Sequence, residues 1–466
     1  MSIIEELVRE KLTQDIPRPV PRDEIIGDLP APARFNRVHI VTGMRRSGKT
    51  FYLYQRMHAL IAQGLLRDRM LYFDFSDDRL PKGDHVIDDV LGAYWRQVPE
   101  ARLAGCYLFL DEVQDCDGWQ GAARRIAQNE AVTMVLTGSS SKVSSSEIAT
   151  QFRGRSHTHE MLPCSFAEFL RFHESELPGG SADALRGQSA YSPQEITALE
   201  SLYDRYLVVG GFPDVQDDPA PVRREVLQGY VRDVVARDVA EKLARPSIPL
   251  ATQLALLILR NTSNETSVNS LVSTLRGAGF RIGWERAEEL VSLFRQAYLF
   301  FEVHEYARGI ASGTTNPPKN YAIDPGLAYA VSRAAQEDIG NRLETAVYLE
   351  LRRRLAGSRT DAICSYTEPK SRSRKVDFLV GEAFAGEAEP AVPYELVQVA
   401  ASLESDRTRK REIESLQAAM QQTGLDRGTI VNLRESSQLQ LEAGTIRMVP
   451  AWRWALERTT TCGQNL

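Results

Sequence analysis

The stretch that decides the fold of the N-terminal part is Gly43-Met44-Arg45-Arg46-Ser47-Gly48-Lys49-Thr50, GMRRSGKT. It matches G-x-x-x-x-G-K-[S/T], with an apolar strand pattern before it at 37–41 and a helical pattern after it at 50–63. In that context the glycines let backbone N–H groups point at phosphate oxygens, and the helix N-terminus adds partial positive charge. We expect Lys49 to reach the β- and γ-phosphates of ATP and Thr50 to ligate Mg²⁺. The alternative interpretation is a strand-to-helix junction without a ligand.

An acidic pair follows the buried strand expected at 107–110. Asp111 is expected to hold Mg²⁺ through water, and Glu112 to orient and deprotonate the water that attacks the γ-phosphate. Alone, such a pair is often a solvated turn. Together with the loop upstream, it predicts a hydrolytic nucleotide site.

Hydroxyl and guanidinium groups complete this expected site. A strand at 133–136 runs into TGSS, so Thr137 or Ser139 is predicted to sense the γ-phosphate or to position water; the alternative is a loop that caps the next helix. In FRGR, Arg155, and less so Arg153, is a candidate for neutralising charge on the transferred phosphoryl group. Exposed arginines are common, so an ordinary surface role stays open.

Composition bounds the class of protein. A chain of 466 residues is expected to form two or three domains, and 43% hydrophobic with 25% charged residues predicts a soluble globular protein. No apolar run is long enough to cross a membrane, and the acidic N-terminus lacks the pattern of an export signal, so we expect a cytoplasmic location. Five scattered cysteines argue against a disulfide framework or zinc site. A net charge of −6 means that any DNA site must be a local patch.

The pattern along the chain predicts an α/β protein with several modules. Short apolar runs alternate with helical patterns from 38 to 160, which is typical of a parallel, buried sheet. Helical periodicity then dominates from 165 to about 306. A second α/β pattern follows, with helices at 341–355 and 408–421 and strands at 363–366, 376–380, 394–399 and 428–432.

Almost the whole chain resembles the prokaryotic AAA-type ATPases that carry a C-terminal DUF4143 domain. The residues that carry the resemblance are GMRRSGKT, YFDFSDDRL, LFLDEVQDCDGWQ, TGSSS, FRGRS followed by LPCSFAEFL, Gly210–Pro213, YAIDPGL and REIESL. The resemblance implies an AAA+ P-loop core with sheet order 5-1-4-3-2, a helical lid, a winged-helix segment and a restriction-endonuclease-like terminal domain. We expect the boundaries 1–36 for an extended lead-in, 37–162 for the core, 163–248 for the lid, 249–310 for the winged helix and 311–466 for the DUF4143 domain.

Two parts of this resemblance bear on binding. A GxP-like element in the lid implies that Gly211 and Pro213 lie near adenine; a rigid turn between helices is the alternative. The winged-helix segment carries arginines that could contact DNA phosphates, although nearby glutamates reduce the positive charge of this surface. The alternative is that the segment binds protein only, as many winged helices do. These arginines are Arg276, Arg281, Arg286 and Arg295.

The terminal domain is expected to have lost nuclease chemistry. Restriction-endonuclease-like folds hold a divalent metal with acidic residues and use a lysine to polarise water. Here Glu344 and Asp377 match acidic positions, but Gln398 occupies the third and Ala400 the lysine position. Glu395 is acidic but is expected on the other face of its strand, unless a bulge re-aims it. We therefore predict a binding or assembly remnant, with an active nuclease as the alternative.

The leading hypothesis is an ATP-hydrolysing protein that acts as a DNA-engaged motor or remodeller, with ATP and Mg²⁺ as ligands. The alternatives are a signal-transducing ATPase switch that responds to a protein partner, and an ATP-regulated nuclease. A homo-oligomer is expected, in which Arg155 acts either in cis or in trans.

Overall fold

The fold comes from a computed structural model. The structure describes residues 2–83, 85–139, 152, 154–243, 247–306, 316–333, 338–355, 362–368, 371–381 and 393–457. The chain divides into two units, the first comprising residues 1–161 and 296–298, the second comprising 162–295 and 299–466.

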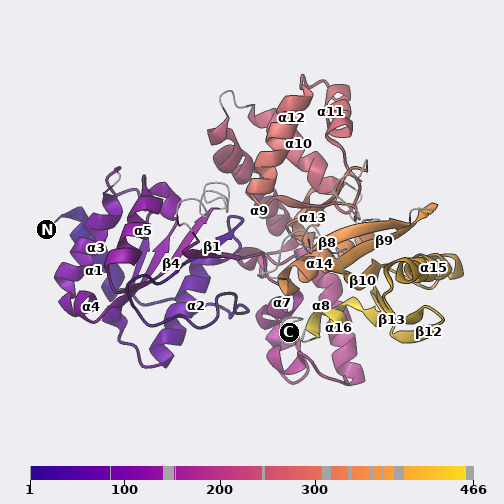
Figure 1. The fold of residues 1–466 in the computed structure, drawn as a ribbon, viewed down its shortest axis with the longest axis horizontal. Helices are drawn as coiled ribbons and strands as arrows, with labels where there is room; N and C mark the ends of the chain where they lie inside the picture. Colours follow the sequence, from indigo (N-terminus) through magenta and orange to yellow (C-terminus); the bar gives the residue numbers. More distant parts are fainter. Residues whose placement is uncertain are drawn as a thin grey trace. The chain divides into compact units, whose positions relative to one another are not determined.

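The first unit is built on a parallel five-stranded sheet in the order β2-β3-β4-β1-β5. Figure 1 labels the neighbouring strands β1 and β4 of this sheet. Its strands are β1 (Val38–Gly43), β2 (Met70–Asp74), β3 (Cys106–Asp111), β4 (Val132–Ser139) and β5 (Ser156–Glu160). Read from the other edge, the order is 5-1-4-3-2, so the predicted α/β P-loop core is confirmed. The edge strand β5 had no apolar run to reveal it, because its sequence is SHTHE and its residues are half-buried or exposed.

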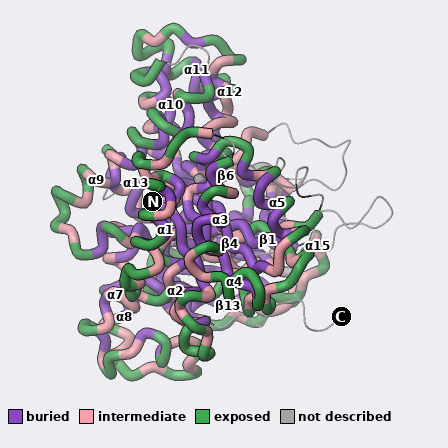
Figure 2. Tube along the Cα trace, turned by 90° about the vertical axis from the view of Figure 1, so that its left-hand side faces the viewer, coloured by how far each residue is buried: buried purple, intermediate pink, exposed green. Residues whose placement is uncertain are grey.

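Side chains alternate between the two faces of this sheet. Ile40, Leu108 and Met134 point into one core cluster, whereas Val41, Phe109 and Val135 point into another. The first cluster contains residues of α1 (Ile3–Thr13), α3 (Val86–Gln97), α4 (Pro99–Leu103) and α5 (Trp119–Asn129), and the second contains residues of α2 (Lys49–Ala62). Helices therefore cover both faces, and β1 and β4 are buried along the tube of Figure 2.

The N-terminal segment is helical before it becomes extended. Ser2 forms a capping box with Glu5, and Leu7 and Val8 of α1 are fully buried. The prolines keep the chain extended after Gln14. The expected extended lead-in thus begins with an 11-residue helix that packs into the core of the first unit.

The second unit begins with helices. These are α7 (Phe166–Phe172), α8 (Pro193–Val209), α9 (Ala220–Asp233), α10 (Ile248–Arg260), α11 (Val268–Gly277), α12 (Trp284–Gln296), α13 (Pro325–Val331) and α14 (Ile339–Arg354). Between α12 and α13, β6 (Phe300–Val303) pairs antiparallel with β7 (Lys319–Ala322). No helix in the described ranges is long and apolar enough to cross a membrane.

A six-stranded mixed sheet completes the second unit, in the order β12-β13-β11-β10-β9-β8. Its elements are β8 (Ile363–Glu368), β9 (Ser371–Gly381), β10 (Pro393–Val399), α15 (Asp406–Thr423), β11 (Arg427–Asn432), β12 (Ser437–Leu441), β13 (Gly444–Pro450) and α16 (Ala451–Leu456). The strands and helices expected from 341 to 432 are present. Leu396 of β10 and Ala400, the residue that follows β10, share the core cluster that contains residues of α15, as the expected alternation requires; the pairing of β10 with β9 shifts register between Pro393 and Glu395.

Candidate nucleotide site

The loop between β1 and α2 has the backbone that its sequence predicts. Gly48 takes φ of 100° and Arg46 takes φ of 69°, so the chain turns through left-handed conformations before α2 begins at Lys49. The Lys49 ammonium folds back into the loop and donates to the carbonyls of Gly43 at 3.2 Å and Met44 at 3.1 Å. The cation thus lies inside the loop, where a phosphate would meet it.

Asp111 is the residue of the site to which three other side chains donate hydrogen bonds. Its carboxylate is almost fully buried and accepts from Thr50 Oγ1 at 2.7 Å, from Tyr72 Oη at 3.0 Å and from Thr137 Oγ1. Burial raises the pKa of Asp111, and the hydrogen bonds from Thr137 and Thr50 oppose that rise. The structure therefore joins Thr50, Asp111 and Thr137, which the sequence placed on three separate segments.

Glu112 stands where β3 ends, in a left-handed conformation with φ of 50°. Its backbone N–H donates to Thr137 Oγ1 at 3.2 Å, and its carboxylate accepts from Gln114 Nε2 at 2.5 Å. Non-glycine residues seldom adopt this backbone, and such residues concentrate at functional sites. The carboxylates of Asp111 and Glu112 thus have separate hydrogen-bond partners.

The residues present fit a triphosphate with Mg²⁺. Within the described residues, Ser47 Oγ is buried without a hydrogen-bond partner, although polar groups in protein interiors are normally paired. A Cβ at Gly43 would lie 2.2 Å from the carbonyl oxygen of Met161, so only glycine fits at the start of the loop. Thr50 and Asp111 supply the oxygen ligands that Mg²⁺ prefers. When bound, Mg²⁺ would neutralise phosphate charge.

Two residues of this region were not expected from the sequence. Tyr72 reaches Asp111 from the middle of β2, and burial raises its pKa. Arg22, in the N-terminal segment, donates to the carbonyl of Ser47 at 2.7 Å. Alternation along MLYFD predicts only that Tyr72 is buried, and nothing local marks Arg22 as a neighbour of the loop.

Arg155 lies away from the loop in its own chain. It directly precedes β5, and its carbonyl accepts from Val38 N at the beginning of β1. Gly43 is at the other end of β1, about 16 Å away at the usual rise of a strand. The Arg155 side chain is exposed, with its guanidinium 5.7 Å from the centre of the Phe35 ring. The structure therefore does not bring Arg155 to Lys49.

The remaining residues of the expected nucleotide site are only partly described. Ser139 ends β4 with its backbone paired beside Gly43, but its side chain lies outside the described residues. Arg153 also lies outside them.

Gly211 and Pro213 belong to the second unit. Gly211 donates through its N–H to Asp324 Oδ2 at 2.6 Å and accepts from Cys164 N at 2.6 Å. A Cβ at Gly211 would lie 2.2 Å from the carbonyl oxygen of Cys164, and Pro213 begins a short 3₁₀ turn. These contacts describe a tight turn inside the second unit; proximity to adenine stays a prediction.

A second polar cluster lies in the terminal sheet region. Lys319 of β7 donates to Glu344 Oε1 at 2.9 Å and to Asp377 Oδ1 at 2.8 Å. Gln398 accepts from Asp377 N at 3.2 Å and donates to Glu412 Oε2 at 2.7 Å. Glu344, Asp377 and Gln398 are thus neighbours, with a lysine that the sequence pattern did not indicate.

Comparison with known proteins agrees with this geometry. Residues 35–170, which contain the whole site around Lys49 and Asp111, match the family described as AAA domain. Residues 200–338 match a domain of unknown function, DUF8612, and not the expected DUF4143. The fold and the site define a P-loop protein of the α/β class. More specifically, residues 35–170 are similar to AAA domains.

The relatives cover most of the chain. An uncharacterized protein of Methanocaldococcus jannaschii is 29% identical over 90% of this chain and 88% of its own length. A second uncharacterized protein, from Haemophilus influenzae, is 26% identical over 74% of this chain and 80% of its own. Among solved structures, a Walker-type ATPase of Pyrococcus abyssi is 14% identical over 64% of this chain and 91% of its own, with a TM-score of 0.42.

Proposed function

We propose that this protein binds Mg·ATP in the loop that begins at Gly43 and hydrolyses it to ADP and phosphate. The observation that carries the proposal is the junction of Thr50, Thr137 and Tyr72 on buried Asp111, next to Lys49 inside the loop. Thr50 and Asp111 hold Mg²⁺, Lys49 neutralises phosphate charge, and Glu112 orients and deprotonates water.

Thr137 takes a positioning role in this proposal. Its hydroxyl donates to Asp111 and accepts from the N–H of Glu112, so one side chain links the metal-holding carboxylate to the turn that carries the base. Any shift of Asp111 on nucleotide binding would therefore reach the Glu112 backbone. We propose that this link senses the γ-phosphate.

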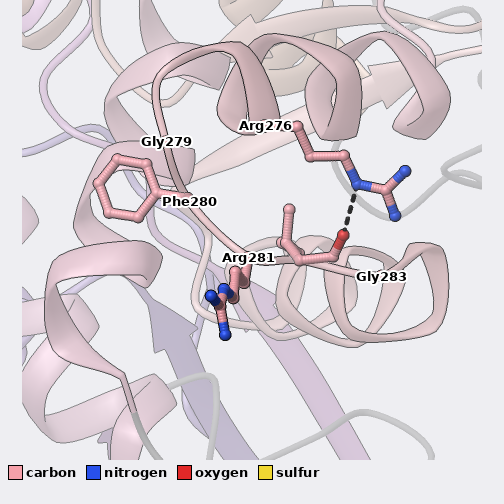
Figure 3. A pocket seen from close by; sticks show the side chains of 6 residues that line it. Arg276, Gly279, Phe280, Arg281 and Gly283 are labelled. Atoms are coloured by element: carbon pink, nitrogen blue, oxygen red, sulfur yellow. Dashed lines mark hydrogen bonds between the residues drawn. The ribbon is translucent and has the colours of Figure 1, made fainter.

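We further propose that ATP turnover drives movement or remodelling on DNA, with 163–248 as a lid and 249–310 as a winged-helix segment. The support is a surface hollow of about 660 Å³ at the turn between α11 and α12 (Figure 3). It is lined by Arg276, Gly279, Phe280, Arg281, Ile282 and Gly283. Both arginines are exposed, and Arg276 is anchored through Nε on the carbonyl of Ile282 at 2.9 Å. Two guanidinium groups beside a small-residue turn suit phosphate contact.

The test compares ATP turnover with and without duplex and single-stranded DNA at several salt concentrations. DNA should stimulate ATP turnover, and Lys49→Ala should abolish turnover with or without DNA. The double variant Arg276→Ala with Arg281→Ala should lose the stimulation by DNA but keep the basal rate of turnover. Arg286→Ala is the matched control, because Arg286 already pairs with Glu289 at 2.6 Å. Turnover that is equal with and without DNA at every salt concentration contradicts the DNA role.

A second candidate is a nucleotide-controlled switch that acts on a protein partner. One observation favours it: Arg286 and Arg295 of α12 are paired with Glu289 and Glu302, and the helix has three glutamates against these two arginines, so it offers no net positive charge to DNA. In this case Glu112→Gln should hold an ATP-bound homo-oligomer without DNA, measured by light scattering. A variant that stays in the wild-type assembly state with ATP argues against the switch.

For the terminal domain we propose a nuclease-like module without cleavage activity. Gln398 is bonded to the Asp377 backbone and to Glu412, and Ala400 supplies no ammonium group. Incubation with Mg²⁺ or Mn²⁺ and branched, single-stranded and duplex DNA should leave the DNA intact. Cleavage that disappears in Asp377→Ala would refute this part of the proposal and favour the third candidate, an ATP-regulated nuclease.

A further inference from the structure

The cluster around Lys319 places the ammonium group of this lysine between the carboxylates of Glu344 and Asp377, both of which are largely enclosed. Side chains of Lys319, Glu344 and Asp377 keep 14%, 14% and 12% of their surface exposed. Tyr321 donates to the same Glu344 oxygen at 2.7 Å, and Val399 N donates to the second oxygen of Asp377 at 3.0 Å. The two carboxylates come from α14 and β9, whereas the ammonium comes from β7. The three groups therefore join three elements that are separated along the chain.

Charge in this cluster is not balanced without the lysine. Burial alone lowers the pKa of Lys319, but the attraction of Asp377 and Glu344 outweighs it, so the net shift is upward and the ammonium stays charged. Burial, followed by repulsion from Asp377, raises the pKa of Glu344. Without the ammonium, two carboxylate oxygens would face each other across the space that Nζ fills. Buried charges persist only where they are paired.

The carboxylate oxygens around Lys319 Nζ are also arranged like the ligands of a metal ion. Both carboxylate oxygens point at one position from different elements, and Mg²⁺ or Mn²⁺ accepts such oxygen ligands. Yet Gln398 is turned to Glu412 and the Asp377 backbone, and no group of three or more His, Cys, Asp or Glu residues able to hold a metal occurs in the described part of the chain. A +1 charge on a flexible stem already satisfies both carboxylates.

We propose that Lys319 is a built-in cation that occupies the position of a divalent metal ion, and that removing it creates a divalent-cation site on Glu344 and Asp377. In the wild-type protein this cation makes the cluster independent of metal. It also fastens β7, the partner strand of β6, to α14 and to the terminal sheet.

A neighbouring contact gives a matched control. Lys375 of β9 pairs with Glu265 at the surface, with 43% and 36% of the two side chains exposed. Lys319→Ala and Lys375→Ala each remove one ammonium from the same unit, but only the first leaves buried carboxylates unpaired. Exposed pairs contribute little to stability, so Lys375→Ala should change the melting temperature by about 1 °C or less.

The experiment measures melting temperature and Mn²⁺ binding on full-length, nucleotide-free protein, with EDTA or MnCl₂. Wild type should melt at the same temperature in both. Lys319→Ala should lose about 5 °C or more in EDTA, recover most of it in Mn²⁺, and bind one additional Mn²⁺ by calorimetry. Lys319→Ala that melts like wild type in EDTA, or that gains no Mn²⁺ site, overturns the proposal.

Two further variants keep the proposal testable if Lys319→Ala fails to fold. Lys319→Ala combined with Asp377→Asn removes one facing charge, so it should fold and show no response to Mn²⁺. The melting temperatures of wild type and of Asp377→Asn are also compared with and without Mn²⁺, and neither protein should respond. A rise in melting temperature with Mn²⁺ that only wild type shows would mean that the metal displaces Lys319. That result would also overturn the proposal.

Discussion

Gly43→Ala tests whether Met161, the residue that follows β5, leaves room for a side chain at the start of the nucleotide loop. A Cβ at Gly43 would lie 2.2 Å from the Met161 carbonyl oxygen and 3.2 Å from its carbon. Ordinary van der Waals contacts of a Cβ lie at 3.4–4 Å, so β1 and the chain leaving β5 must separate. That movement would also break the 2.7 Å hydrogen bond from Met161 N to the Thr42 carbonyl.

The cost follows from these two contacts. Overpacking at a rigid backbone costs about 1–3 kcal/mol, and a lost backbone hydrogen bond adds about 0.5–1.5 kcal/mol. We expect Gly43→Ala to lower the stability of the first unit by about 2–4 kcal/mol, which corresponds to a loss of about 5–15 °C in its melting temperature. Because the loop begins at this residue, the stabilisation by Mg·ATP should also shrink.

The assay is thermal unfolding with and without Mg·ATP at about 100 times its dissociation constant, where binding stabilises wild type by about 2.7 kcal/mol. Gly121→Ala is the matched control, because Gly121 is exposed in α5 and nothing lies within 4 Å of its added Cβ. It should keep the Mg·ATP effect and gain up to about 1 kcal/mol in helix stability. A Gly43→Ala protein with wild-type stability and a full Mg·ATP effect refutes the crowding argument.

Three other variants give further checks. Tyr72→Phe removes a donor from buried Asp111 and should lower the free energy of unfolding by about 1–2 kcal/mol, seen in urea denaturation; no change would mean that this bond is not needed. Gly211→Ala should destabilise the second unit by about 2–4 kcal/mol, because its Cβ would lie 2.2 Å from the Cys164 carbonyl oxygen; wild-type melting would contradict this. Burial lowers the pKa of His39 to about 4, so the folded protein is stabilised above pH 6.5 and loses this stability as the pH falls towards 4. The free energy of unfolding should fall by about 1–2 kcal/mol at pH 5. His39→Leu should flatten this pH dependence, and an unchanged slope would contradict the role of His39.

Local patterns were sufficient for β1 to β4 and for the nucleotide loop of the first unit, but not for the edge strand β5. Apolar runs at 38–41, 70–75, 106–110 and 133–136 became β1 to β4, because a sheet covered on both faces requires apolar side chains on both. Glycine spacing and the acidic end of β3 marked Lys49, Thr50, Asp111 and Glu112, since parallel strands end at one edge of the sheet. Each of these signals lies within a few residues of the group that it predicts.

Contacts between distant segments were decided only by the tertiary structure. Lys319 in NPPKNYAI looks like an ordinary polar residue, and it becomes a counter-ion because the chain brings it to carboxylates 25 and 58 residues away. Arg22 reaches Ser47 in the same way, and Arg155 lies at the far end of β1 because β5 runs parallel to it. Hydrophobic periodicity reports the burial of one element, whereas ion pairs depend on the path of the whole chain. The sequence by itself therefore determined the class of fold and the nucleotide loop, and the fold in three dimensions decided which charges meet.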